Sequence, residues 1–335
     1  MINSNELLKT VKELCLIDGI SGDEGRVREY IINEIKGICE YKVDALGSVI
    51  GTVRGGSGLL VTAHMDEVGM IVTSVGEDGF IGFDTVGGID ERLLPDKRVT
   101  INGNTCVIAC KPVHLMSGDE KKKPLSTDEL YIDIGAQNKD EALKLVSLGD
   151  SINFEREYFN FGDGYISSPA LDDRIGCAVL ICLIKNAKKP FSFAFTVQEE
   201  VGTRGAYAAA FAQKPYVAIA VETTTAADVP DVAEDKSVAK LNFGATLSFM
   251  DRATVYDRDE LKRLIEIAEA DGIKWQYKRA VAGGNDMGAI HKTGEGAKPI
   301  AISVPARYLH SPSVVVNEDD ILSVYRLTER YIEIF

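Results

Sequence analysis

The chain has few of several residue types. Its 335 residues include one tryptophan and four histidines, and no stretch approaches the ~20 consecutive apolar residues of a membrane span. Lys and Arg (37) are outnumbered by Asp and Glu (51), which gives a net charge of −14. This charge argues against nucleic acid or an anionic membrane as a partner, because both require a basic face.

Cysteine is also scarce, with six residues: Cys15, Cys39, Cys106, Cys110, Cys177 and Cys182. Cys106 and Cys110 lie in one strand-like segment, but no His or Cys pair is placed to complete a metal site with them. We therefore expect free thiols in a reducing cytoplasm. The N-terminus also lacks a basic segment followed by a long apolar one, so we expect no signal peptide.

Helix and strand patterns alternate in two parts of the chain. Apolar runs predict strands over residues 59–63, 191–197, 216–221 and 298–304, and a 3.6-residue period predicts helices over 172–186, 257–270 and 319–335. A further amphipathic helix is predicted with Val27, Ile31, Ile35 and Ile38 on one face. Such alternation is typical of an α/β fold.

Short β-rich runs separated by glycine turns occupy residues 70–161, with one short helix predicted at Lys139–Val146. We interpret this block as an insert in a single α/β domain. The predicted organisation is a catalytic domain part in residues 1–69, a β-rich insert in residues 70–161 and a second catalytic part in residues 162–335.

The most informative feature that is present is a pair of adjacent carboxylates, Glu199 and Glu200, directly after the apolar run 191–197. Two anionic side chains at the end of a buried strand repel each other and resist desolvation. They are tolerated if they are solvated or if a cation lies between them. A metal ion is the obvious candidate.

Other potential metal ligands also lie at predicted strand or helix ends. His64 and Asp66 share one face of a strand end, because residues i and i+2 of a strand point the same way. Acids at a helix start are also favoured by the helix dipole, so Asp172 and Asp173 have a plain structural explanation. Nevertheless, the set contains nitrogen and oxygen donors that suit two zinc, cobalt or manganese ions: His64, Asp172 (or Asp173), Glu200, Glu222 and His310.

The chain resembles the dinuclear metal aminopeptidases of the glutamyl aminopeptidase and tetrahedral aminopeptidase family, some of which are labelled endoglucanase or cellulase. Five stretches that span nearly the whole chain carry the resemblance. They are residues 63–69 (AHMDEVG), 170–176 (ALDDRIG), 196–202 (TVQEEVG), 283–291 (GGNDMGAIH) and 307–312 (RYLHSP).

The resemblance implies a zinc-peptidase-like α/β/α catalytic domain with an inserted β-rich dimerisation domain. It implies a metal-dependent aminopeptidase of short peptides that forms dimers, which can assemble into a twelve-subunit particle. It further implies the following site roles: His64, Asp172 and Glu222 hold one metal, Asp172, Glu200 and His310 hold the other, Glu199 is the general base, and Asp66 orients His64. The adjacent pair leaves open whether Asp172 or Asp173 is the bridge.

Two positions depart from the family pattern. Most of these aminopeptidases have Asp where this chain has Glu222, and Thr where it has Asn285. A Glu at the first position accompanies deacylase or carboxypeptidase activity in related metallohydrolases, so an N-acyl amino acid deacylase or a carboxypeptidase-like amidohydrolase stays the alternative function. A glycoside hydrolase is disfavoured, because the adjacent Glu199 and Glu200 are poorly placed to flank a glycosidic bond.

Overall fold

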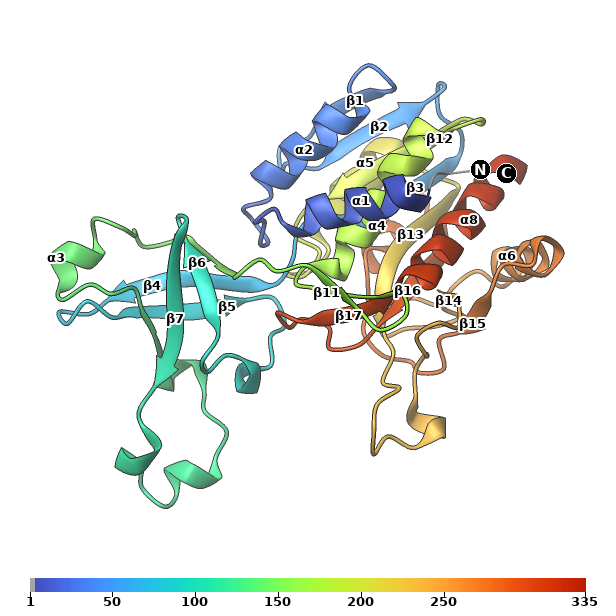
Figure 1. The fold of residues 1–335 in the computed structure, drawn as a ribbon. Helices are drawn as coiled ribbons and strands as arrows, with labels where there is room; N and C mark the ends of the chain where they lie inside the picture. The colour runs from blue at the N-terminus through green and yellow to red at the C-terminus, as the bar shows by residue number, and fades with distance from the viewer. Residues whose placement is uncertain (1–3) are drawn as a thin grey trace.

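The centre of the protein is an eight-stranded sheet in a computed structural model that describes residues 4–335 (Figure 1). In spatial order its strands are β1 (Glu40–Val43), β2 (Val49–Val53), β12 (Phe191–Thr196), β3 (Leu59–His64), β13 (Val217–Thr225), β16 (Lys298–Ala306), β14 (Ala245–Leu247) and β15 (Trp275–Tyr277). Strands β12, β3, β13 and β16 run parallel, whereas β2 and β14 pair antiparallel with the outer two. The carboxyl ends of the four parallel strands therefore meet at one edge of the sheet.

Helices cover both faces of this sheet. On one face lie α1 (Ser4–Cys15), α2 (Gly25–Ile35), α4 (Leu171–Lys185), α6 (Arg258–Asp271) and α8 (Glu318–Ile334), and on the other lie α5 (Arg204–Gln213) and α7 (Met287–Ile290). Strand β13 shows why both faces are covered: Val217, Ile219 and Val221 pack into the first layer, while Ala218 and Ala220 pack into the second. This arrangement confirms the predicted α/β fold.

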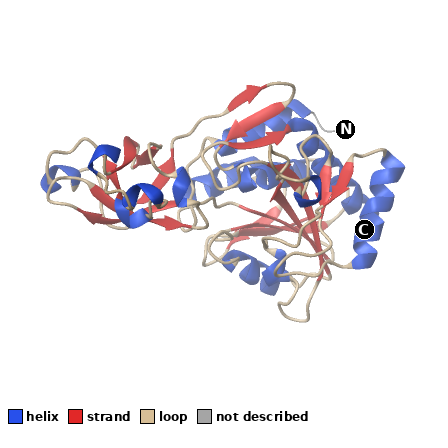
Figure 2. Ribbon diagram, turned by 90° about the horizontal axis from the view of Figure 1, so that it is seen from below, coloured by secondary structure: helices blue, strands red, loops and turns tan. Residues whose placement is uncertain are grey.

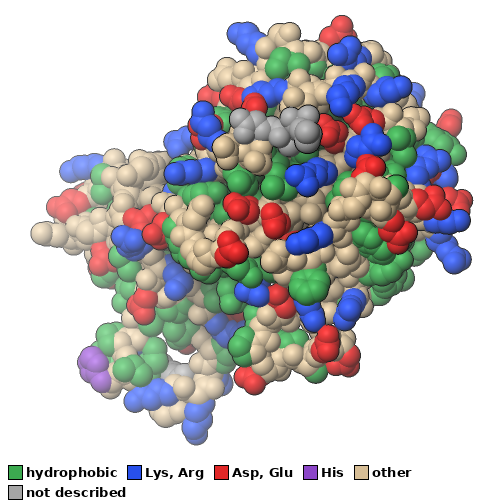
Figure 3. Space-filling view, turned by 45° about the vertical axis from the view of Figure 1, so that its right-hand side comes forward, with side chains coloured by type: hydrophobic (Ala, Val, Ile, Leu, Met, Phe, Trp, Pro, Cys, Tyr) green, Lys and Arg blue, Asp and Glu red, His purple; other side chains and the backbone are tan. Residues whose placement is uncertain are grey.

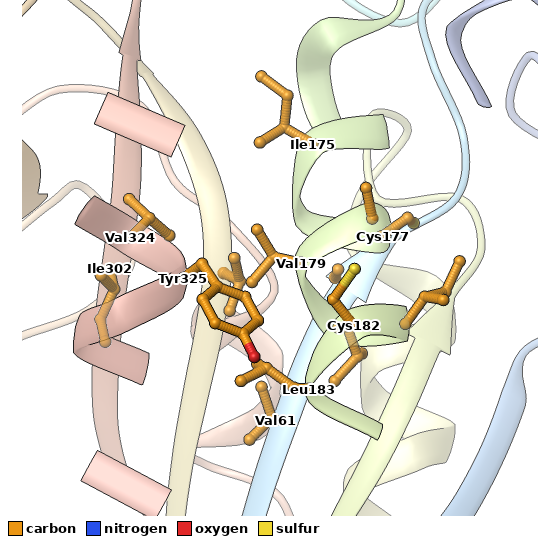
Figure 4. Close-up of a cluster of buried hydrophobic side chains, with 14 of the residues drawn as sticks. Val61, Ile175, Cys177, Val179, Cys182, Leu183, Ile302, Val324 and Tyr325 are labelled. Atoms are coloured by element: carbon orange, nitrogen blue, oxygen red, sulfur yellow. The ribbon is translucent and has the colours of Figure 1, made fainter. Parts of the chain in front are cut away.

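Helix α4 lies at the centre of the larger layer. From Ile175 to Ile184 it carries no polar or charged side chain other than cysteine, as expected of a helix segment that is buried on every side. Figure 4 shows its surroundings, in which Val179 and Leu183 of α4 face Tyr325 of α8, and Val61 of β3 lies next to Leu183. The start of α4 is thereby held firmly against the carboxyl edge of the sheet.

A closed barrel stands to one side of the large sheet (Figure 2). Around the barrel its strands are β4 (Gly69–Val75), β5 (Ile81–Val86), β8 (Leu130–Asp133), β7 (Asn104–Cys110), β6 (Arg98–Ile101) and β9 (Ser151–Phe154). The barrel has a hydrophobic core of its own, separate from that of the sheet. Its helix α3 spans only Lys139–Ala142, so the predicted extension to Val146 was wrong, because the hydrogen bond from Leu145 N to Ala142 O tightens the chain into turns.

A three-stranded sheet connects these parts, with the order β10 (Phe159–Phe161), β11 (Tyr165–Ser168) and β17 (Val314–Asn317). Strand β11 leads into α4 and β17 leads into α8. One helix boundary differs from the prediction: α2 ends at Ile35, because Gly37 takes a left-handed φ of 79° and turns the chain. Ile38 is therefore exposed and does not share the buried face.

The surface carries both signs of charge. Lys and Arg side chains are interspersed with Asp and Glu over the face seen in Figure 3. No helix within residues 4–335 is long and apolar enough to cross a membrane.

One buried cation ties the start of α4 to the preceding segments. Arg174 is fully buried and donates hydrogen bonds of 2.8 to 3.1 Å to five oxygens: Met65 O, Leu14 O, Ile17 O, Gly19 O and Glu67 Oε1. Arg174→Met is expected to lower the free energy of unfolding by about 3–5 kcal/mol, because it leaves buried acceptors without a donor. Denaturant unfolding measures this loss. The exposed Arg26→Met is the control, and a loss below about 1 kcal/mol for Arg174→Met would contradict the assignment.

Candidate metal centre and active site

The predicted site residues gather at the carboxyl edge of the parallel strands, where open α/β sheets bind ligands. His64 is the last residue of β3, the Glu199–Glu200 pair follows β12, and His310 follows β16. Glu222 was expected just beyond its strand, but β13 continues to Thr225 and Glu222 lies within it. Asp172 completes the group from the start of α4.

Both histidines present the same ring nitrogen to the cluster. His64 Nδ1 lies 3.0 Å from Asp66 O, and His310 Nδ1 lies 2.7 Å from Gly88 O. A carbonyl oxygen can only accept a hydrogen bond, so each Nδ1 carries the proton. In the neutral rings the Nε2 atoms are then unprotonated and available as ligands.

These Nε2 atoms face carboxylate oxygens. His64 Nε2 lies 3.4 Å from Asp172 Oδ1 and 3.6 Å from Glu222 Oε2. His310 Nε2 lies 3.6 Å from Asp172 Oδ2 and 3.3 Å from Glu200 Oε2. Asp172 thus turns one oxygen to each imidazole. Because lone pairs would otherwise face lone pairs, a cation or a proton must lie between each pair.

Burial makes it unfavourable for these acids to be ionised when no cation is bound. Glu222 Oε1 and Asp173 Oδ2 are buried and have no hydrogen-bond partner among the described residues. Burial raises the pKa of Glu222, Asp173 and Glu200 above their usual values. Burial also lowers the pKa of His310, but hydrogen bonds to Asp172 and Glu200 outweigh it and bring this pKa to about 11.

The donor set therefore fits divalent cations. Two groups could each hold a metal ion, one of His64, Asp173 and Glu222 and one of His64, Asp172 and Glu200. Imidazole nitrogen with carboxylate oxygen suits zinc, cobalt and manganese. A bound cation would neutralise carboxylate charge. Without a cation, only the two imidazoles, when protonated, can do so.

The two adjacent aspartates differ in their contacts. Asp173 Oδ1 accepts a hydrogen bond from Gly176 N at 3.0 Å, whereas both oxygens of Asp172 face imidazoles. The peptide bond between them is cis, and neither has helical backbone angles. Sequence alone left the choice between them open.

Asp66 makes contacts beyond His64. Its carboxylate accepts hydrogen bonds from Glu199 N at 3.0 Å, Glu200 N at 3.1 Å and Ser21 Oγ at 2.6 Å. Its Oδ1 lies 3.5 Å from His64 Nδ1, farther than its own main-chain carbonyl. The side chain therefore holds the turn that carries the glutamate pair.

Sequence reasoning missed three groups at the site. Gly88, which follows strand β5 of the barrel, supplies the carbonyl that fixes His310. Asp286 is fully buried, and its Oδ2 accepts a hydrogen bond of 2.5 Å from Thr196 Oγ1. Glu24 accepts a hydrogen bond from Gln198 N. Only Asp286 carried a sequence signal, because it belongs to the 283–291 motif.

The protein has a large cavity far from the cluster and a small one that borders it. One of about 1520 Å³ opens at the amino ends of β13 and β16, with Tyr216, His291 and Lys298 in its wall. It lies at the opposite edge of the sheet from the cluster of imidazoles and carboxylates. A much smaller cavity, of about 10 Å³, is bounded by Asp172, Glu200 and His310.

Comparison with known proteins identifies the family of this chain. The family model for M42 glutamyl aminopeptidases matches residues 47–327. A putative aminopeptidase of Acetivibrio thermocellus is 39% identical, over 97% of this chain and 98% of its own. A TET aminopeptidase structure from a marine-sediment thaumarchaeon has a TM-score of 0.95 at 31% identity, covering 99% and 97% of the two chains.

The TET1 peptidase of Pyrococcus horikoshii, which can assemble into a tetrahedron or an octahedral shell, has a TM-score of 0.87 at 36% identity and covers 97% of this chain and 99% of its own. These matches extend over nearly the whole chain. The chain belongs to the M42 glutamyl aminopeptidase family and is a peptide-bond hydrolase.

Proposed function

We propose that this aminopeptidase works with two divalent ions held on either side of Asp172. The supporting observation is that Asp172 turns one carboxylate oxygen to His64 and the other to His310. His64, Asp172 and Glu222 would hold one ion, and Asp172, Glu200 and His310 the other. Zinc or cobalt suits these donors best, and manganese is also accommodated. When bound, such ions supply Lewis acidity and lower the pKa of water.

Glu199 is the proposed general base. Unlike Glu200 and Glu222, its carboxylate forms no ion pair with an imidazole among the described residues, which leaves it free for proton transfer. Burial and the neighbouring Asp286 and Glu200 raise its pKa. A base with a raised pKa is matched to neutral pH: Glu199 takes a proton from water and delivers it to the leaving amine. Asp66, through the amides of Glu199 and Glu200, holds the base in place.

The charge of the site favours a peptide with a free amino terminus. Six carboxylates surround or adjoin the two imidazoles: Asp66, Asp172, Asp173, Glu199, Glu200 and Glu222. This surplus attracts an α-ammonium group, whereas an N-acyl amino acid offers only a carboxylate. The glycosidase alternative is disfavoured because three of these acids converge on shared imidazoles and do not stand apart across a glycosidic bond.

A substrate panel tests this function. Metal-loaded protein is expected to hydrolyse Leu-, Glu- or Lys-p-nitroanilide at a kcat/KM at least about 10²-fold above the matching N-acetyl anilides and N-acetyl amino acids, because only the former carry an α-ammonium. Release of nitroaniline, and of acetate from the N-acetyl amino acids, measures the rates, and chelator-treated protein is the control. Faster release of acetate from the N-acetyl amino acids would instead establish the deacylase.

The assembly and compartment are also proposals. Residues 70–161 would form the dimerisation domain between catalytic parts 1–69 and 162–335, and dimers would build a dodecamer. Support comes from the tetrahedral assembly of the TET1 relative and from exposed apolar residues in the connections between the barrel strands, namely Val113, Leu115 and Leu148. The six free cysteines support a cytoplasmic location.

A further inference from the structure

Three consecutive backbone amides in the turn after β12 donate to two buried carboxylates. Gln198 N donates to Glu24 Oε1 at 3.1 Å, and Glu199 N and Glu200 N donate to the two oxygens of Asp66 at 3.0 and 3.1 Å. This turn carries the proposed base and one proposed metal ligand. Its orientation is therefore set by acceptors outside the turn.

The Glu24 acceptor comes from a distant segment. Glu24 lies between α1 and α2, in a part of the chain that the family model does not match, and 174 positions separate it from Gln198. The same Oε1 also accepts from Gly22 N at 2.8 Å. Nearby, Ser21 Oγ donates to Asp66 Oδ2. The α1–α2 connection therefore supports the turn in two ways. Glu24 accepts a hydrogen bond from the turn directly, and Ser21 donates one to Asp66, which itself accepts from the turn.

The backbone of the turn needs this support. Gln198 has a φ of 57°, in the left-handed region that is unfavourable for a residue other than glycine. Such a conformation persists only where the surroundings determine it. The carbonyl of Gln198 is also engaged, because Arg204 N donates to it at 3.2 Å.

Glu24 itself is costly to bury. Only 3% of its surface is exposed, and no cation forms an ion pair with it among the described residues. Burial raises its pKa above the usual value, and the two amide hydrogen bonds oppose that rise. A buried acid that pairs only with backbone amides is suited to fixing those amides.

We propose that Glu24 is a positioning residue for catalysis, whose carboxyl oxygen fixes Gln198 N and so aims the carboxylate of Glu199. This inference rests on the proposed role of Glu199 as the base. Glu24 acts as an acceptor and not through its charge. A glutamine, which keeps the acceptor oxygen, should therefore replace it, and a methionine of similar length should not.

The test compares Glu24→Met, Glu24→Gln and the exposed neighbour Asp23→Ala in full-length, metal-loaded protein. Glu24→Met is expected to lower kcat for Leu-p-nitroanilide about 10- to 100-fold, because small displacements of catalytic groups have effects of this size. KM and bound metal are expected to stay within about twofold, since Glu24 contacts neither. Glu24→Gln is expected to keep kcat within about threefold, and Asp23→Ala within about twofold.

Hydrogen exchange of the segment 196–202 gives a readout that is independent of turnover. Its amides are expected to exchange faster in Glu24→Met and at the wild-type rate in Glu24→Gln. Wild-type kcat in folded Glu24→Met, or equal loss in both variants, would overturn the proposal. If Glu24→Met does not fold, a loss of kcat in Glu24→Gln is by itself enough to overturn the proposal. Inactive wild-type protein would instead refute the proposed function.

Discussion

Glu199→Gln is expected to lower kcat for an aminoacyl anilide by at least about 10³-fold while metal content stays unchanged, because an amide cannot accept the proton of water. The geometry separates Glu199 from the proposed ligands: Glu200 and Glu222 lie within 3.6 Å of an imidazole Nε2, and Glu199 makes no such contact among the described residues. KM is expected to stay within about threefold, because glutamine preserves shape and burial.

Steady-state kinetics and elemental analysis of the purified variant measure the two effects. Glu77→Gln, at an exposed acid in the barrel, is the matched control and should behave as wild type. Glu200→Gln should instead lose bound metal. A Glu199→Gln enzyme with wild-type turnover would show that the base lies elsewhere.

Asp172→Asn is expected to abolish binding of both proposed ions and to lower kcat by at least about 10³-fold, since its carboxylate is the proposed shared ligand of the two ions. Its Oδ1 and Oδ2 lie 3.4 and 3.6 Å from the Nε2 atoms of His64 and His310. The amide of asparagine carries no negative charge and offers one oxygen, so it cannot bridge two cations. Equilibrium dialysis followed by elemental analysis counts the bound ions.

Asp173→Asn is the control for this variant. The introduced amide would still accept the hydrogen bond from Gly176 N through its remaining oxygen, so both ions should stay bound and kcat should fall less than about tenfold. Metal loss in Asp173→Asn with retention in Asp172→Asn would assign the bridge to Asp173. This comparison decides what the adjacent pair left open.

Sequence reasoning succeeded where local patterns are long. Strands β3, β12 and β13 are six to nine residues long and begin with five or six residues that are buried on both faces, so apolar residues dominate there. The polar end of β13, Glu222 to Thr225, was not predicted as strand for the same reason. It failed on short elements. The last two strands of the sheet, β14 and β15, have three residues each, which is too short for any periodicity to appear. The prediction of a β-rich block held, but closure into a barrel depends on the pairing of β4 with the distant β9.

The sequence by itself determined the fold class and the chemical types of the proposed ligands, because buried strands, helix periods and the motifs around His64, Asp172 and Glu199 are local patterns. The tertiary structure alone decided which groups position these side chains and the turn that carries Glu199. Gly88 lies 222 positions from His310, and Glu24 lies 174 positions from Gln198. Such contacts join main-chain groups to side chains across the chain, and main-chain carbonyls and amides are common to nearly all residue types, so no residue pattern marks them.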